Sequence, residues 1–127
     1  MTGKQDDILR IDSEPADGAE IVRLTGVIDA HTYEEVQEHL EQVISGGVAR
    51  IVIDFHGVRY ISSSGIGVFI GALARARQNG GDLLLLNVTA TVRETFSVLG
   101  LLPMFFVAPN KQAALAYFDR RGGFVRK

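Results

Sequence analysis

From residue 50 onward, short apolar runs alternate with longer segments of helical periodicity, and this alternation limits the possible folds more than any other feature of the chain. Short apolar runs bounded by glycine or polar residues are typical of buried strands, whereas apolar residues at every third or fourth position indicate helices. We predict strands at 50–55, 83–88 and 104–107, and helices that end at about Gln78, at Leu99 and at about Phe118. Such alternation favours right-handed crossovers in a largely parallel sheet.

The residues before this alternation add two strands and a helix. Strands are predicted at 8–12 and 21–28, and the turn-rich segment between them indicates a hairpin. Thr32 and Glu35 form a capping-box pattern ahead of a helix that reaches about Ile44. The hairpin makes the sheet mixed. The sequence therefore predicts an α/β domain with a mixed sheet of about five strands flanked by about four helices.

Capping signals also place the starts of the last two helices. Thr91 and Glu94 repeat the capping-box pattern at the start of the short helix, and Asn110 is available to cap the last one. The residues of the short helix that we expect to face inward are Val92, Phe96 and Leu99.

The composition excludes several classes of protein. With 127 residues, 46% of them hydrophobic, the chain fits one domain with a substantial core. A net charge of −2 argues against a nucleic-acid-binding protein, which usually carries a large basic excess. There is no cysteine to form a disulfide or a thiolate metal site, and His31, His39 and His56 lack the spacing of metal ligands. We expect no metal and no cofactor.

Both ends of the chain are expected to lie outside the domain, which we place at residues 8–118. Residues 1–7 lack the apolar stretch of a signal peptide and are predicted to be a flexible N-terminus. Residues 119–127 include four basic residues and are predicted to be a solvated C-terminal tail rather than an interaction arm. No apolar stretch approaches the ~20 residues that span a bilayer, which favours a cytoplasmic protein without membrane contact.

Three serines stand between the third strand and the helix that follows it. Ser62, Ser63 and Ser64 precede Gly65 where backbone N–H groups lack helical partners and the helix dipole is positive. This position accommodates a phosphate, either on a bound ligand or attached to a serine. Serines before a glycine also commonly form a turn and a helix cap, and Ser62 is placed to act as that cap.

The serine segment carries no recognisable catalytic motif. It has no Walker lysine, no Gly-x-Gly-x-x-Gly pattern and no Gly-x-Ser-x-Gly nucleophile elbow. Nothing elsewhere in the sequence suggests a convergent pair of acid and base residues. Enzymatic activity is therefore disfavoured, and attachment of a phosphate is favoured over binding of a free nucleotide.

The helix after the serines has two different faces. The face expected to pack on the sheet contains Ile66, Phe69, Ile70, Leu73 and Arg77. The opposite face follows helical spacing through Ser64, Val68, Gly71 and Arg75, with Gly67 and Ala72 beside it. Small, weakly charged residues are typical of a docking surface that a partner approaches closely. Glycine and alanine also allow tight packing against a neighbouring element, so both interpretations stay open.

Two aspartates lie at or near strand ends. Asp54 is in an apolar strand and either faces a ligand site at the carboxyl end of the sheet or forms a hydrogen bond there. Asp29 ends the second strand, where capping of the next helix is one possible role.

An ordered series of short motifs runs through the chain. The segments are 26–29, 53–58, 63–67, 80–83, 87–88 and 92–93, together with Val36 and Leu40. They resemble the STAS domain of bacterial anti-sigma-factor antagonists, which is also found as a cytosolic domain of sulphate transporters. The resemblance extends from about residue 8 to 118 and implies a STAS-type mixed sheet flanked by helices.

The resemblance implies partner switching. The unmodified protein would bind an anti-sigma factor that is also a serine kinase, and so free the sigma factor. Phosphorylation would release the antagonist, and a serine/threonine phosphatase of the metal-dependent class would reset it. The family acceptor is the first hydroxyl of an Asp-Ser-Ser/Thr-Gly pattern, which is Ser63 here, with Ser64 and Ser62 less favoured. Ser62 occupies the position of the family aspartate.

The partner-binding surface is predicted to combine the serine segment with the outward helix face. Its residues are Asp29, Ser62, Ser64, Gly65, Gly67, Val68, Gly71 and Arg75. By family analogy Asp29 lies near the acceptor. The protein is expected to be a monomer or a weak dimer. The alternative is a STAS module that is never phosphorylated and serves as a scaffold or binds a nucleotide or lipid, which the serine at position 62 favours.

Overall fold

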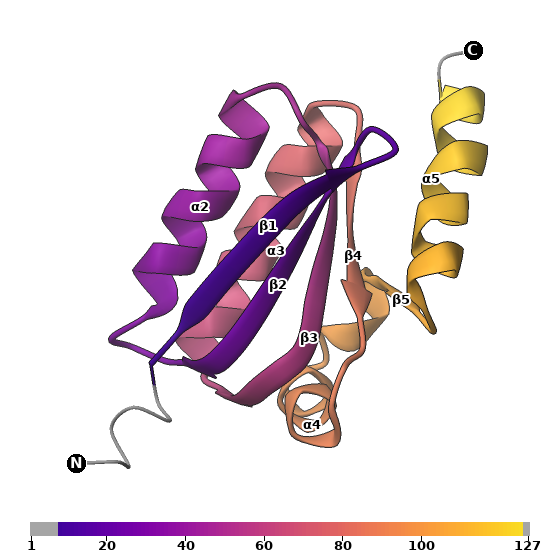
Figure 1. The fold of residues 1–127 in the computed structure, drawn as a ribbon. Helices are drawn as coiled ribbons and strands as arrows, with labels where there is room; N and C mark the ends of the chain where they lie inside the picture. The colour runs from indigo at the N-terminus through magenta and orange to yellow at the C-terminus, as the bar shows by residue number, and fades with distance from the viewer. Residues whose placement is uncertain (1–7, 126–127) are drawn as a thin grey trace.

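The computed structural model describes the backbone of residues 8–125 and the side chains of residues 8–119. This part of the chain forms one five-stranded sheet with helices on both faces (Figure 1). The strands are β1 (Arg10–Ala16), β2 (Ala19–Ile28), β3 (Arg50–Ile61), β4 (Asp82–Leu86) and β5 (Phe106–Ala108). They lie side by side in sequence order, β1 antiparallel to β2 and the others parallel. The helices are α2 (Tyr33–Ser45), α3 (Ser63–Gln78), α4 (Ala90–Val98) and α5 (Lys111–Val125), with a short 3₁₀ turn η1 (Leu102–Met104). The predicted mixed sheet with four flanking helices is confirmed.

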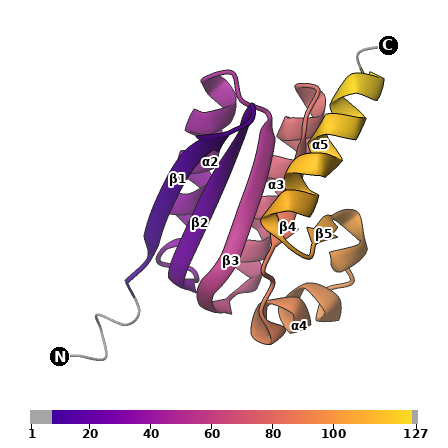
Figure 2. The ribbon, with the colours of Figure 1, turned by 45° about the vertical axis from the view of Figure 1, so that its right-hand side comes forward.

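The order of the strands decides which face each helix covers. Every parallel connection moves to the next strand in the same direction, so right-handed crossovers place α2, α3 and α4 on one face. The larger core lies beneath these helices and contains Phe55, whose ring makes edge contacts with Phe69 and Phe96 at centroid distances of 5.3 and 6.2 Å. On the opposite face α5 packs over the β4 side of the sheet (Figure 2), where Ala114 and Phe118 are buried in a smaller core.

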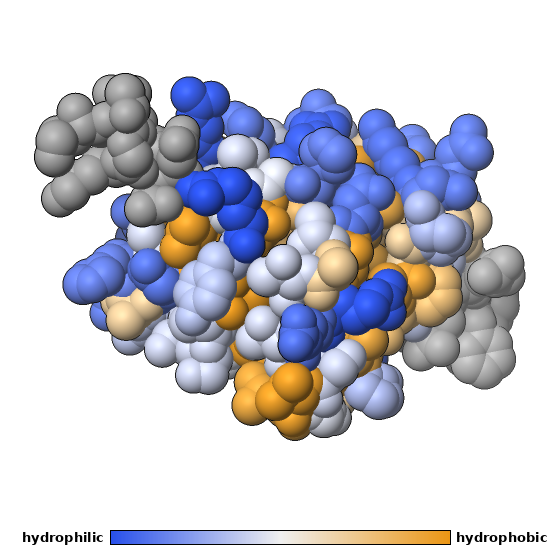
Figure 3. Space-filling view, turned by 90° about the horizontal axis from the view of Figure 1, so that it is seen from below, coloured by the Kyte–Doolittle hydropathy of each residue, from blue (hydrophilic) through white to orange (hydrophobic). Residues whose placement is uncertain are grey.

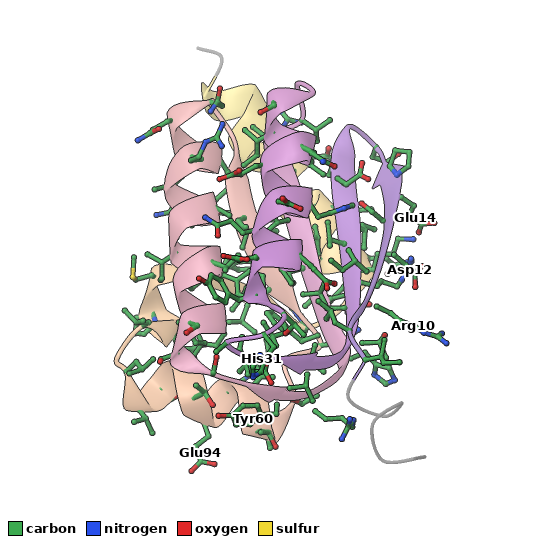
Figure 4. The ribbon with its side chains drawn as sticks, turned by 90° about the vertical axis from the view of Figure 1, so that its left-hand side faces the viewer. Arg10, Asp12, Glu14, His31, Tyr60 and Glu94 are labelled. Atoms are coloured by element: carbon green, nitrogen blue, oxygen red, sulfur yellow. The ribbon has the colours of Figure 1, made fainter. Side chains whose placement is uncertain are left out.

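The first hairpin is tighter than the sequence predicted. β1 continues to Ala16, so half of the turn-rich segment between the predicted strands 8–12 and 21–28 belongs to this strand. Only Asp17 and Gly18 form the turn, with positive φ angles of 54° and 84°, and Ala16 pairs with Ala19. Asp-Gly is a favoured pair for the two-residue turn with positive φ at both positions. Arg10, Asp12 and Glu14 project from this edge strand (Figure 4), and exposed charges discourage edge-to-edge association of sheets.

β3 is longer than predicted and extends to Ile61, so the turn before α3 consists of Ser62 alone. Its pairing with β2 shifts register twice, between Arg23 and Thr25 and between Gly26 and Val27. These irregularities interrupt the alternation of buried and exposed residues by which a strand is recognised in a sequence. β4 and β5 are instead shorter than predicted: they end at Leu86 and begin at Phe106.

Of the four predicted helix caps, two form a side-chain capping hydrogen bond and two do not. The Thr32 hydroxyl accepts a hydrogen bond from Asp29 N and donates to Val27 O, so it fastens the loop rather than capping α2. α4 begins one residue before Thr91, because Thr89 Oγ1 accepts from Val92 N. Asn110 caps α5 as predicted, with Oδ1 2.8 Å from Ala113 N.

Three further expectations need correction or fall outside the described residues. Leu99 was expected to face inward but is 45% exposed. α5 continues to Val125, so the chain is helical over most of the predicted basic tail. The predicted flexible segment 1–7 and the last two residues lie outside the described part of the chain. Within that part, no helix has the length and apolarity needed to cross a bilayer.

Candidate functional site

The serine segment lies at the carboxyl end of the parallel strands, where β3 passes into α3. Ser62 N donates to Ile28 O at 2.8 Å, which continues the pairing of β2 with β3. Ser62 Oγ accepts from Gly65 N at 3.3 Å, so Ser62 is the N-cap of α3, as its position in the sequence predicted. Ser63 is the first residue of the helix, and both Ser63 and Ser64 are exposed.

Gly65 brings the start of α3 close to the sheet. A Cβ atom at this position would lie 2.7 Å from Ile28 Cγ2 and 2.8 Å from Ile61 Cγ1, both at the ends of paired strands. Gly65 is buried, so it lies beneath the predicted contact surface, and its contact with a partner stays a prediction. Because glycine has no Cβ atom, the first turn of α3, with the serines, can lie directly against the edge of the sheet.

The outward face of α3 is only partly exposed. Val68 is 8% exposed and belongs to the larger core, which corrects its predicted place on a free surface. Gly67 and Gly71 are exposed, and a Cβ atom built on either meets nothing within 4 Å. Arg75 is half-buried. Val68 therefore packs inward, whereas the two glycines leave open space, and docking of a partner on this face stays a prediction.

The opposite face of α3 packs on the sheet as predicted, with two exceptions. Ile66, Phe69 and Leu73 are buried, but Ile70 is only partly buried. The side chain of Arg77 is 51% exposed and its Nε donates to Asp82 Oδ1 at 3.1 Å. Arg77 therefore pairs with the start of β4 instead of covering the sheet.

A groove of about 260 Å³ separates α2 from α3. Its lining residues are Gln37, Leu40, Glu41, Ile44, Gly67, Val68, Gly71, Ala72 and Arg75. The groove is open partly because Gly67 and Gly71 have no side chain to fill it. The sequence indicated the α3 wall of this groove but not the α2 wall, because helical spacing does not show which helices become neighbours.

Asp29 organises the loop between β2 and α2. Its Oδ1 accepts from His31 N at 2.9 Å, and its carbonyl accepts from the backbone N of Thr32 and of Tyr33. These bonds favour the helix-start role that the sequence left open. Asp29 also directly follows Ile28, whose carbonyl bonds Ser62 N, so the loop and the serine segment leave the sheet side by side.

The end of the molecule that carries these residues is the one at which α2, α3 and α4 begin. His31 and Tyr60 lie toward this end (Figure 4), and Tyr60 is 49% exposed. The space-filling view onto this end shows pale, weakly polar side chains at its centre, with apolar side chains beside them (Figure 3). No role for Tyr60 is predicted from the sequence, which places the end of this strand at Phe55 instead of Ile61.

Asp54 is held by hydrogen bonds on the face of the sheet that α5 covers in part. Its Oδ1 accepts from His56 N at 2.9 Å and from Asn87 Nδ2 at 3.1 Å, and its Oδ2 lies 3.9 Å from Arg23 Nε. This arrangement favours the strand hydrogen-bonding role. A hollow of about 550 Å³ adjoins these residues. The sequence places Asn87 in a family-like segment but predicts no role for it; its positive φ of 55° is common for asparagine.

Arg23 also joins the first two strands. Its Nη2 donates to Glu14 Oε2 at 2.7 Å, and this hydrogen bond lowers the pKa of Glu14 and raises the pKa of Arg23 from their ordinary values.

Across residues 8–119 no three histidine, aspartate or glutamate side chains are grouped to hold a metal ion.

Comparisons with known proteins give one family. The family model described as the STAS domain matches residues 10–114. The chain is 33% identical over 110 residues to BtrV of Bordetella bronchiseptica, covering 87% of this chain and 95% of BtrV. It is 31% identical over 106 residues to the anti-sigma F factor antagonist of Lysinibacillus sphaericus, covering 83% and 87% of the two chains. The Bacillus cell-fate determinant SpoIIAA in its phosphorylated form superposes with a TM-score of 0.65 at 25% identity, covering 89% and 98%.

Proposed function

This chain belongs to the STAS domain family, and on that premise we propose that it is an anti-sigma-factor antagonist that acts by partner switching. The unmodified protein binds an anti-sigma factor that is also a serine kinase, and so frees a sigma factor in the cytoplasm. Phosphorylation of Ser63 releases the antagonist, and a serine/threonine phosphatase resets it. This chain performs no catalytic step in the proposed cycle.

The observation that carries the proposal is the exposed hydroxyl of Ser63 at the first position of α3. Because Ser62 already caps the helix, modification of Ser63 leaves that hydrogen bond in place. The helix dipole favours a phosphate there by roughly 0.3–1 kcal/mol, so the modification is compatible with the fold.

The proposed switch is therefore local. A phosphoserine adds about −1.5 to −2 charges at neutral pH to the middle of the contact surface. An unpaired charge that must be desolvated on binding weakens affinity by ~100-fold or more, which suffices for release without a large conformational change. The names of two relatives support this proposal: one is called an anti-sigma factor antagonist, and another is described in a phosphorylated form.

Affinity capture and mass spectrometry test the proposal. Wild-type protein is expected to retain an anti-sigma factor with a kinase domain, and Ser63→Asp is expected to lose it. The purified partner and ATP should add one phosphoryl group to the peptide that contains Ser62, Ser63 and Ser64. Ser63→Ala should abolish the addition, and unchanged modification of that variant would move the acceptor to Ser62 or Ser64.

A second candidate function is a constitutive STAS module that is never phosphorylated. Ser62 favours it, since this residue replaces the family aspartate with an uncharged cap. Retention of the same partner at equal affinity by Ser63→Asp and by wild type would support this candidate against the switch.

A further inference from the structure

The groove between α2 and α3 has an apolar floor and an open mouth. The buried side chains on its floor include Leu40 and Ile44 from α2 and Val68 and Ala72 from α3. At Gly67 and Gly71 the neighbouring space is empty, so these two residues leave the mouth of the groove unobstructed. A cleft of about 260 Å³ is below the size of typical small-molecule pockets, and is better suited to one or two side chains of another protein.

The groove begins beside the proposed phosphorylation site. Gly67 lies one helical turn after Ser63, and Val68 one turn after Ser64. With a rise of about 1.5 Å per residue, the groove extends from roughly 6 to 18 Å beyond Ser63 along α3. A partner protein that covers Ser63 and extends along α3 would therefore also cover the groove.

The two walls of the groove carry opposite charges. α2 has four exposed carboxylates, at Glu34, Glu35, Glu38 and Glu41, and no lysine or arginine. Glu41 lines the groove, and Glu34 lies two turns before it on the same side of α2. The α3 wall carries Arg75 and no carboxylate. A partner that fits must place basic residues against α2.

We propose that the α2–α3 groove receives an aliphatic or aromatic side chain of the anti-sigma partner, flanked on the α2 side by lysine or arginine residues of that partner. The inference rests on the proposed function and specifies the chemistry of its partner. The apolar side chain supplies the anchor, since buried anchors in pockets dominate the affinity of protein interfaces. The charges on α2 select the orientation and speed the encounter. Phosphorylation of Ser63 adds charge beside one end of the groove without filling the groove.

Filling the groove from within tests the anchor. Gly71→Leu places an apolar side chain where the structure has open space, and leucine favours a helix more than glycine does, so Tm should stay the same or rise. Affinity for the purified partner, measured by calorimetry, should fall roughly 30-fold or more. Ala116→Leu is the matched control, because it adds the same kind of side chain to an exposed position of α5 on the other face of the sheet.

Charge reversal tests the chemistry of the partner. Glu41→Lys should weaken binding about tenfold, and its affinity should depend less on salt than that of wild type. Stronger binding by Glu41→Lys would contradict basic residues on the partner.

The experiment separates this inference from the function on which it rests. If Ser63→Asp loses the partner but Gly71→Leu binds as tightly as wild type, the groove is not occupied and the switch stands. If Ser63→Asp itself binds as wild type does, the switch fails. An equal loss of partner affinity in Gly71→Leu and in Ala116→Leu would also contradict binding of the partner in the groove.

Discussion

At the scale of single residues, Ser62 and Gly65 fix the position of Ser63. Ser62 bonds the strand end through its backbone N–H and the helix start through its hydroxyl. Gly65 allows the first turn of α3 to approach Ile28 and Ile61 more closely than any residue with a Cβ atom could. The proposed acceptor thus follows a strand–helix junction of one residue rather than lying in a loop.

Two glycine substitutions on the same helix should have opposite effects on stability. Gly65→Ala forces a contact below 3 Å with two buried isoleucines, so we expect the free energy of unfolding to fall by about 1–3 kcal/mol. Gly67→Ala meets no neighbour and should raise it by up to ~1 kcal/mol, because alanine favours helix. Urea denaturation measures both. Similar changes in the two variants would show that close packing at Gly65 is not what requires glycine.

At the scale of elements, the antiparallel pair β1–β2 and the helix pair α2–α3 have different roles. β1 completes the sheet and carries exposed charges along its edge. α2 and α3 cover the larger core and leave between them the groove that we assign to the partner. A hydrogen-bonded ion pair, Arg23 to Glu14, links β1 and β2 in addition to their backbone pairing, and apolar packing holds the helices.

The hairpin cross-link should be visible in the titration of Glu14. Arg23 lowers the pKa of Glu14, so the pair contributes to stability above the ordinary glutamate pKa and the contribution is lost as pH falls through the lowered value. Arg23→Gln should raise the pKa of Glu14 in an NMR titration of the carboxyl carbon. The effect on stability should be small because both side chains are largely exposed. An unchanged Glu14 titration in the variant would contradict the pairing.

At the scale of the whole molecule, the sheet separates two cores of unequal size. The larger core is closed by three helices that all begin at the serine end, whereas the smaller one is closed by α5 alone. The serine segment and the groove lie on the side of the larger core, and Asp54 with its hollow lies on the other face. Changes at α5 should therefore affect stability more than partner binding.

Phe118→Ala tests this separation. Phe118 is 4% exposed in the smaller core, and its truncation should cost about 3–5 kcal/mol of unfolding free energy. Phe106 is 40% exposed, so Phe106→Ala should lower the free energy of unfolding less than Phe118→Ala does. Under conditions in which Phe118→Ala remains folded, its affinity for the partner should match wild type. A selective loss of affinity would place part of the partner surface on α5.

The architecture and the chemical character of the serine segment can be predicted from the amino-acid sequence alone. Alternating apolar runs and helical repeats require a layered α/β fold, since each element must bury its apolar side, and the Ser62 cap depends on contacts three residues apart. Tertiary structure decided the rest. The extension of β3 to Ile61 depends on pairing with β2, and the burial of Gly65 and Val68 depends on neighbours distant in the chain. Local periodicity shows which residues share a face, but only packing decides which face is covered and which, like the groove between α2 and α3, stays open.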